Sequence, residues 1–308
     1  MDPKQQIIDT LIQAENVISG ARLSERLGIS RVAVWKHIQA LVHSGIPIVA
    51  SPKGYRLGSD PDSLQPWAFG PRQTQIHYHP ETPSTMDNAA LLARQGCPDF
   101  TIAVAQRQTR GRGRMQRDWL SADGGLYFSV IIRPDLPMLL AGLVNLAAAI
   151  DMADLLRSDY QIDAKLKWPN DILVNKHKIC GILSQMEAEG DRVAYMNVGI
   201  GLNVNNTPET EEPVAVSMKA LLGRSIPRRQ VLAAFLDRFE KRMNTFDPHA
   251  VIDQWRACNV TIGQWVRVFV IKEMIEGTAV DVDDHGGLIL RLADGTLKTA
   301  MVGDCFHR

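Results

Sequence analysis

The chain has no surplus of charge of either sign, because 34 lysines and arginines balance 34 aspartates and glutamates. A protein that coats nucleic acid over its whole surface carries a positive surplus, so the neutral total argues against that class and allows only a local basic patch. The chain also lacks an apolar run of the ~20 residues that span a bilayer. The nearest candidate, 138–150, contains Gly142 and Asn145 and leads into Asp151, which indicates a buried core helix and no membrane segment.

Cysteine is scarce as well. The four cysteines are scattered, without CxxC spacing or the density of a disulfide scaffold. We therefore expect reduced thiols with structural or incidental roles, in a cytoplasmic protein. The N-terminal residues MDPKQQIID lack the apolar core of a signal peptide, so we expect none.

The composition changes twice along the 308 residues, which predicts an α+β protein of three domains. Helical patterns fill 5–57, and a Pro/Gly/Ser-rich linker is expected at 58–72. Strand-like and helical segments then alternate, and short alternating strands after 261 predict a small β-barrel. We place the domains at 1–62, 63–260 and 261–308.

Residues 18–57 are typical of a winged helix-turn-helix. Gly28 follows a first helix over 21–27, and a glycine supplies the left-handed backbone of a tight turn. Ser30 is suited to cap a second helix, whose apolar stripe is formed by Val34, Ile38 and Leu41. The following 46–57 reads as the two-stranded wing.

Charge supports a DNA-facing surface in this block. Residues 20–57 hold six lysines and arginines and one acid, a net charge of +5. A three-helix protein-interaction module without DNA is the alternative. The residues that we expect to meet DNA are polar and lie on the outer face of the second helix or in the wing: Ser30, Arg31, Lys36, His37, Gln39 and Lys53.

A second basic segment, 106-QRQTRGRGRMQRDW-119, places five arginines in eleven residues. Its composition allows a disordered Arg/Gly nucleic-acid tract, although such tracts are longer and repetitive. It does not match the GxxxxGK[ST] pattern of a phosphate-binding P-loop. Strand-like runs flank it at 101–109 and 124–133, which favours an ordered loop whose arginines clamp an anion.

Three later stretches narrow the chemistry. The stretch 165-KLKWPNDILV-174 places a carboxamide beside a carboxylate, which suits a base edge and magnesium, although a turn capped by these side chains is the simpler interpretation. We expect 175–183 to be a hairpin with Lys176 and Lys178 at its tip. The glycines of 198-VGIGLNVNN-206 allow a ligand to pass close to a strand.

The ordered set GRGR, GGLYFS, KWPND, KICGIL and VGIGLNVN resembles the biotin–protein ligases. Together with the N-terminal winged helix-turn-helix, it resembles the bifunctional type that is also the biotin operon repressor. The resemblance covers essentially the whole chain. It implies a mixed-sheet catalytic domain of the biotin/lipoate ligase type and an SH3-like C-terminal barrel.

The resemblance implies that biotin and ATP form biotinyl-5′-AMP, from which biotin passes to a lysine. The catalytic residues implied are Arg112, Arg114 and Lys178. The residues implied to bind biotin include these three, and the others lie in 83-PSTMDNA-89, where the family's Ser-Thr pair appears, in the arginine segment 106–119 and in 198–206: Ser84, Thr85, Met86, Gln108, Gly111, Gly113, Gly199 and Gly201. Met86 stands where an asparagine is frequent, and we expect it to contact biotin through its backbone alone.

The residues implied to bind ATP are Arg117, Trp119, Lys167, Asn170, Asn203 and Arg308, and Asp171 is the candidate for Mg²⁺. The implied partners are operator DNA, the biotin carboxyl carrier protein of acetyl-CoA carboxylase, and a second copy of the chain in a ligand-induced homodimer. Gln116 occupies a position where relatives often have glycine, which makes the folding of the loop a question.

Three rival functions remain open from the sequence. They are a biotin-binding repressor without catalysis, a lipoate-type ligase, and a ligase whose N-terminal domain only shapes the active site.

Overall fold

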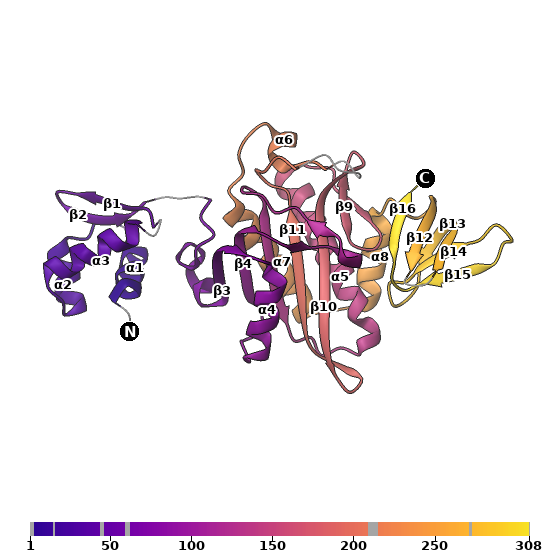
Figure 1. Cartoon of the computed structure of the whole chain (residues 1–308), viewed down its shortest axis with the longest axis horizontal. Helices are drawn as coiled ribbons and strands as arrows, with labels where there is room; N and C mark the ends of the chain where they lie inside the picture. Colours follow the sequence, from indigo (N-terminus) through magenta and orange to yellow (C-terminus); the bar gives the residue numbers. More distant parts are fainter. Residues whose placement is uncertain are drawn as a thin grey trace.

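The computed structural model describes residues 3–14, 16–43, 46–58, 62–208, 215–270 and 273–307. The N-terminal domain lies at one end of the molecule, the C-terminal domain at the other, and the catalytic domain between them (Figure 1).

The N-terminal domain is the expected winged helix-turn-helix. Its elements are α1 (Pro3–Gln13), α2 (Gly20–Leu27), α3 (Arg31–His43), β1 (Ile48–Ser51) and β2 (Gly54–Leu57). Gly28 ends α2 with a left-handed φ of 66°, and the Ser30 hydroxyl accepts a hydrogen bond from the Ala33 amide at the start of α3. The stripe of Val34, Ile38 and Leu41 is buried against α1 and α2.

The expected linker is wrong in part, because Pro66–Gln75 forms a 3₁₀ helix, η1, kinked at Gly70. The prolines and glycines that suggested irregular chain are accommodated at its start and at the kink. Trp67 is buried with the N-terminal core, whereas Phe69 is buried with the catalytic core. The segment is therefore a packed connector.

A buried arginine ties the chain just before η1 to the catalytic domain. Arg228 is 4% exposed and forms an ion pair of 2.7 Å with Asp62. Its guanidinium also donates to the Gly125 carbonyl and to Gln106 Oε1 at 3.1 Å each. Burial of this charge is compensated by three acceptors from separate segments.

Among the described residues, seven strands form the central sheet in the order β3-β4-β7-β11-β10-β9-β8. Only β3 and β4 run parallel in this sheet. In that spatial order the strands span Ile76–Thr82, Thr101–Gln108, Leu126–Ile132, Arg192–Leu202, His177–Glu189, Asp171–Val174 and Lys165–Lys167. Every residue of β7 is buried, because both faces of the sheet are covered.

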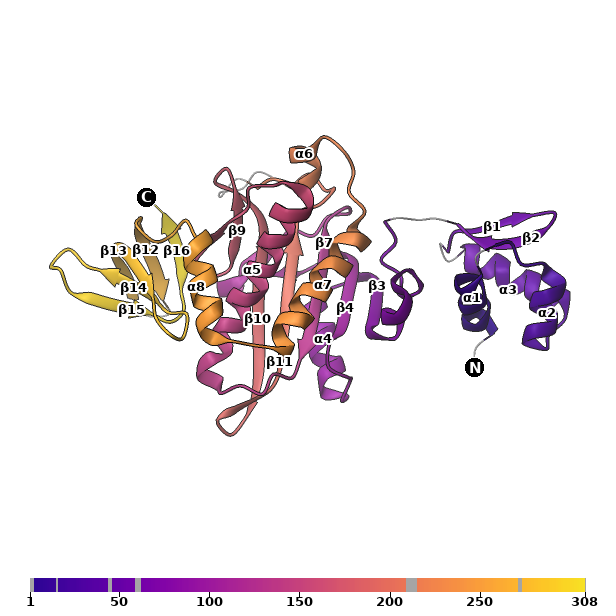
Figure 2. The same cartoon turned by 180° about the vertical axis from the view of Figure 1, so that it is seen from behind.

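Helices cover the two faces unequally. One face carries α4 (Thr85–Arg94), and the other carries α5 (Ala141–Tyr160), α7 (Arg228–Asn244) and α8 (Pro248–Cys258), as the two opposite views show (Figures 1 and 2). The segment Met138–Tyr160, which is η3 (Met138–Leu140) followed by α5, is long and apolar enough to span a membrane, but 78% of its most apolar stretch is buried in the protein. The expected core helix is confirmed. A short helix, α6 (Met218–Leu222), follows β11.

The C-terminal domain consists of five described strands in the order β15-β14-β13-β12-β16. They are β12 (Trp265–Val270), β13 (Glu273–Val282), β14 (Leu288–Arg291), β15 (Leu297–Ala300) and β16 (Asp304–His307). Trp168 anchors the domain to the catalytic sheet, since its Nε1 donates to the Gly286 carbonyl at 2.9 Å and its amide donates to Thr261 Oγ1 at 3.0 Å.

Candidate functional site

Most residues implied to bind biotin meet in one cavity of about 540 Å³. Its wall combines the start of α4, the end of β4 and the neighbouring strands β10 and β11. The implied residues that line it are Ser84, Thr85, Met86, Gln108, Arg112, Gly113, Arg114, Lys178, Gly199 and Gly201. We refer to it as the first cavity.

Hydrogen bonds fix the polar side chains of this cavity. Gln108 Oε1 accepts from the Thr85 amide at 2.7 Å, and its Nε2 donates to Ser121 Oγ at 2.8 Å. The Thr85 and Ser129 hydroxyls lie 2.9 Å apart. Since Ser84, Thr85 and Ser129 are buried, the cavity presents a preorganised polar patch.

Two side chains require the glycines of β10 and β11. A Cβ at Gly199 would lie 2.5 Å from Met86 Sδ, and one at Gly181 would lie 2.9 Å from the Trp119 ring. The same ring crosses Gly201. The Met86 side chain is thus part of the cavity wall, which differs from the expected backbone-only contact.

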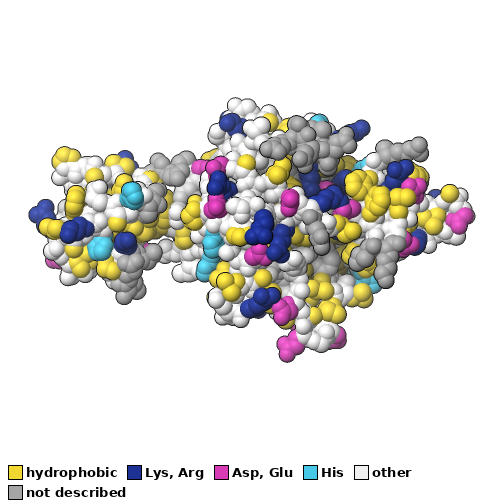
Figure 3. All heavy atoms as spheres, viewed as in Figure 1, with side chains coloured by type: hydrophobic (Ala, Val, Ile, Leu, Met, Phe, Trp, Pro, Cys, Tyr) yellow, Lys and Arg dark blue, Asp and Glu magenta, His cyan; other side chains and the backbone are white. Residues whose placement is uncertain are grey.

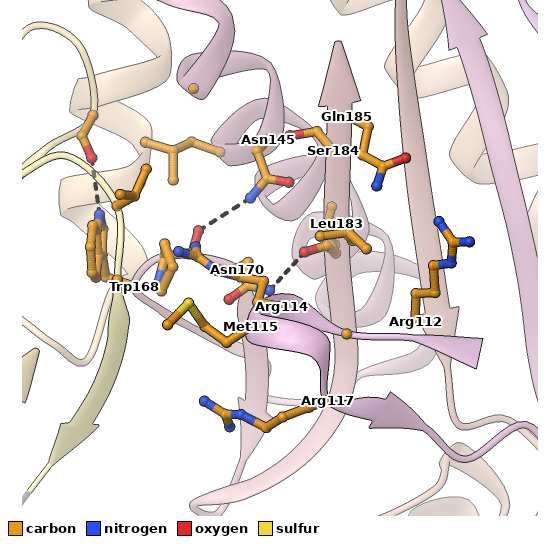
Figure 4. A pocket seen from close by; sticks show the side chains of 18 of the residues that line it. Arg112, Arg114, Met115, Arg117, Asn145, Trp168, Asn170, Leu183, Ser184 and Gln185 are labelled. Carbon is orange, nitrogen blue, oxygen red and sulfur yellow. Dashed lines mark hydrogen bonds between the residues drawn. The ribbon is translucent and has the colours of Figure 1, made fainter. Parts of the chain in front are cut away.

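A second cavity of about 1070 Å³, shown in Figure 4, adjoins the first, and the arginine loop lines both. The loop is ordered as β5 (Gly111–Arg112), the turn η2 (Arg114–Gln116) and β6 (Asp118–Trp119). Its left-handed residue is Met115, with φ 51°, so the turn does not place that conformation at Gln116. Arg112, Gly113, Arg114 and Arg117 line both cavities.

Carboxylates from distant segments hold these arginines. Arg112 pairs with Asp87 of α4 at 2.7 Å. Asp304 of β16 forms an ion pair with Arg117 and lies 3.8 Å from Arg114 Nε. No pattern in the sequence indicates Asp304, because it lies almost 200 residues from the loop.

Lys178 faces the site and does not lie at the hairpin tip as expected. The turn falls at Asn175 and Lys176, which have positive φ, and this places Lys178 within β10. Its Nζ lies 2.6 Å from Asp171 Oδ1 and 5.2 Å from the centre of the Trp119 ring. Burial lowers the pKa of Arg114, an effect that the nearby Asp171 opposes.

The implied ATP residues divide between the two cavities. Asn170 lines both, and its Nδ2 donates to the Ile182 carbonyl at 2.7 Å. Trp119 and Asn203 line the first cavity, where Asn203 Oδ1 accepts from Asn206 at 2.9 Å. Lys167 lies 6.0 Å from the centre of the Phe306 ring and lines neither cavity.

Two further implied residues stand apart. Gly111 lies behind the cavity walls, where a Cβ would come within 2.6 Å of Ser121 Oγ. Arg308 lies outside the described residues. No group of three or more His, Cys, Asp or Glu side chains that could hold a metal occurs in the described part of the chain, so Asp171 belongs to no such group there.

The implied DNA-binding residues lie at the start of α3, along α3 and in the turn of the wing. Arg31, Lys36, Gln39 and Lys53 are exposed, His37 is half-buried, and Ser30 caps α3. A shallow groove of about 390 Å³ runs between α3 and the wing. Trp35 lines it and is 53% exposed, a feature that its apolar character did not suggest in the sequence.

Comparison with known proteins agrees with this geometry. Residues 78–203 match the biotin/lipoate A/B protein ligase family, 3–56 match an HTH domain, and 261–308 match the biotin protein ligase C-terminal domain. The bifunctional ligase/repressor BirA of Bacillus subtilis is 36% identical over 96% of both chains.

The chain belongs to the bifunctional biotin ligase/repressor family.

Two further similar proteins cover a smaller share of this chain. The biotin–[acetyl-CoA-carboxylase] ligase of Mycobacterium tuberculosis is 32% identical over 76% of this chain and 89% of its own. The biotin protein ligase of Aquifex aeolicus in complex with biotin and ATP has a TM-score of 0.63 and 28% identity, and covers 76% of this chain and 98% of its own.

Proposed function

We propose that the chain is an ATP-dependent ligase that forms biotinyl-5′-AMP and transfers biotin to a lysine of a carrier protein, and that it represses biotin genes when it holds biotinyl-5′-AMP. The observation that carries the ligase activity is that Arg112, Arg114 and Lys178 line the first cavity together with the polar groups proposed for biotin. The match to the bifunctional relative over its whole length supports both activities.

Biotin occupies the first cavity in this proposal. Ser84, Thr85 and Gln108 supply the hydrogen-bonding groups for its ureido ring, and Gly199 and Gly201 form the floor with Met86. Gly111 acts indirectly, because it lets β5 pack against Ser121. The carboxylate of biotin then points toward the arginine loop.

In the first reaction, the biotin carboxylate oxygen bonds to the α-phosphorus of ATP, and the bond to the β-phosphate oxygen breaks, which releases pyrophosphate. Negative charge on the phosphate oxygens is stabilised by Arg112, Arg114 and Lys178. Their side chains are held before the ligand arrives, by Asp87, Asp304 and Asp171 respectively.

In the second reaction, a neutral lysine amine bonds to the acyl carbon of biotinyl-5′-AMP, and AMP leaves. The amine gives up its proton in forming the amide. The acceptor is a biotin carboxyl carrier protein, for which we propose that of acetyl-CoA carboxylase, and the location is the cytoplasm.

ATP spans the junction and extends into the second cavity. Asn170 and Arg117 border both cavities, and Trp119 and Asn203 approach the adenylate from the first. Lys167 and Arg308 contribute charge from the side of the C-terminal domain.

Magnesium fits this site at Asp171. Mg²⁺ commonly takes one or two protein carboxylates together with phosphate oxygens and waters, so a single aspartate at the junction suffices. When bound, the ion neutralises charge on the phosphates. Lys178, which pairs with Asp171, would then lie beside the same phosphate oxygens.

In this proposal, repression depends on a homodimer whose two-fold symmetry matches that of the operator DNA. A homodimer that forms when biotinyl-5′-AMP is bound presents two α3 helices and two wings to a two-fold operator. The exposed cations Arg31, Lys36 and Lys53 then meet phosphates, and His37 and Gln39 are available to base edges.

Lys178→Ala tests the ligase assignment. We expect adenylate formation, measured as biotin-dependent pyrophosphate release, to fall by about a thousandfold, because a charge aimed at the reacting phosphate is lost. Lys176→Ala, at the hairpin tip, is the matched control and should remain near wild type. Near-normal release by Lys178→Ala would remove Lys178 from the chemistry, and competition of lipoate with biotin would favour the lipoate-type rival.

A further inference from the structure

Two large apolar side chains are exposed side by side on α3. Val32 is 64% exposed and Trp35 is 53% exposed. Residues three positions apart on a helix are neighbours on its surface, so the two form one apolar strip. The contacts proposed above for phosphates and polar base edges use neither residue. Adjacent exposed apolar groups are unfavourable in water, and they mark a surface that a partner covers.

The strip lies in the middle of the outward face of α3. With 3.6 residues per turn, Trp35 falls between Arg31 and Gln39, and Val32 falls beside Lys36. All five of these residues are exposed, whereas the stripe on the opposite face of the helix is buried against α1 and α2. The apolar strip is therefore surrounded by the polar residues implied to meet DNA.

The groove that contains the strip is built entirely by the N-terminal domain. Each residue that lines it, Val32 and Trp35 included, lies between positions 19 and 55. Ile18 and Tyr55 exchange two backbone hydrogen bonds of 2.8 Å, which fix the wing against the start of α2. Gly54 has a φ of 133°, and a Cβ there would lie 2.1 Å from the Ile18 carbonyl oxygen. The wing is thus held in place before a ligand arrives.

The charges of the groove are of one sign. Arg31 lines it from α3 and Lys53 lines it from the wing, and none of the described residues that line it is acidic. A matching ligand has anionic groups at its margins and an apolar group between them. The major groove of DNA has this arrangement, because phosphates border the base edges and the thymine 5-methyl is an apolar group on those edges.

We propose that Val32 and Trp35 determine operator specificity by packing against thymine 5-methyl groups in the major groove. The inference rests on the proposed binding of operator DNA. The first half of a recognition helix is the part that contacts base edges in a helix-turn-helix, and both residues lie there. The neighbouring cations hold the phosphates, and the apolar strip then distinguishes thymine from the other bases.

The test begins with a random-sequence duplex library, from which the full chain selects binding sites in the presence of biotin and ATP. In the selected duplex, each thymine is replaced in turn by deoxyuridine, which removes the methyl group and keeps the hydrogen-bonding groups. Affinity is measured by fluorescence anisotropy. We expect a position in each half-site where uracil weakens binding about fourfold, and a loss of about tenfold when both half-sites are changed.

The double variant Val32→Ala/Trp35→Ala should lose this discrimination, so that the thymine and uracil duplexes bind it with a ratio near one. Both side chains are exposed, so the variant loses little of the core. Val42→Ala is the matched control, because Val42 is a 43% exposed apolar residue of α3 that does not line the groove. It should keep the wild-type ratio.

Two results would overturn the inference. One is wild-type binding that uracil leaves unchanged at every thymine, a measurement that needs no variant to fold. The other is a double variant that keeps the wild-type discrimination, which would assign the apolar strip to a protein partner and not to DNA. A library from which no sequence is enriched would be a different outcome, since it would overturn the proposed operator binding and the inference with it.

Discussion

The two basic regions of the molecule, the surface of α3 and the wing and the arginine loop, differ in whether their cations are paired with carboxylates. On the α3 and wing surface, no ion pair joins Arg31, Lys36 or Lys53 to a carboxylate among the described residues. In the arginine loop, Arg112 and Arg117 are paired with Asp87 and Asp304. Figure 3 shows the same contrast, since basic side chains of the catalytic domain lie beside acidic ones, whereas those of the N-terminal domain stand mostly among uncharged groups.

The contrast reflects the shapes of the two ligands. DNA is a long polyanion, and mobile exposed cations gain affinity by releasing its counterions without needing one geometry. An acyl phosphate is a single small group, so its cations must be held at fixed positions before it arrives. The local density of arginine is thus a weaker guide to function than the carboxylates around it.

Salt should separate the two regions most strongly. With three exposed cations in each of two modules, about six phosphate contacts form, and operator affinity should fall roughly a thousandfold between about 50 and 200 mM salt. Pyrophosphate release should change less than about threefold, because Arg114 is largely buried and Arg112 and Arg117 are each paired at short range with a carboxylate. Fluorescence anisotropy on operator DNA and the release assay measure the two. Equal salt dependence would contradict the comparison.

Arg114→Gly should weaken retention of the adenylate. Arg114 lines both cavities, and loss of its charge-assisted contacts should speed release of biotinyl-5′-AMP by about thirtyfold. Free adenylate would then label lysines of bystander proteins. Arg107→Gly, whose arginine pairs with Glu81 and lines neither cavity, is the control. Unchanged retention would exclude Arg114 from the clamp.

Asp304→Asn should have a smaller effect of the same sign. Asp304 pairs with Arg117 and lies 3.8 Å from Arg114 Nε, so its removal releases two arginines that should be in place before the phosphates arrive. We expect the KM of ATP to rise about threefold, because lost positioning outweighs the gain in net positive charge. Glu276→Gln removes an ion pair with Arg267 in the same domain and should leave the KM unchanged. A lowered KM would mean that Asp304 acts by neutralising charge and does not position the loop.

The smallest expected effect is on the pH dependence of folding stability, through His307 of β16. Burial, with a contribution from Lys167, lowers the pKa of His307 from 6.5 to about 4. Between these values the unfolded chain binds more protons than the folded one, so stability falls as pH decreases from 6.5 toward 4. His307→Gln should flatten this part of the unfolding curve by up to one proton. An unaltered pH slope would show that other groups control it.

Local patterns in the sequence predicted the N-terminal domain well. Gly28, Ser30 and the stripe from Val34 to Leu41 act within one or two turns, and each takes the expected role. The strands of the catalytic domain were also predictable, because buried runs such as 126–132 are apolar except for Ser129. The helices α4 and α8 were not predicted.

Long-range contacts could not be read from the sequence. Asp304 meets the arginine loop, and Trp168 meets Gly286, only after the C-terminal domain folds against the catalytic domain. The hairpin error at Lys178 has a local cause, since the turn depends on left-handed backbone at Asn175 and Lys176, and lysine gives little signal for that conformation.

The buried ion pair between Arg228 and Asp62 bears on where a stand-alone ligase could be cut from this chain. A truncation that begins after Asp62 would remove one carboxylate from a guanidinium that is 4% exposed and that also holds the carbonyl of Gly125 before β7. The smallest catalytic unit therefore starts upstream of η1. The segment that connects the DNA-binding domain to the catalytic domain therefore also contributes to the stability of the catalytic domain.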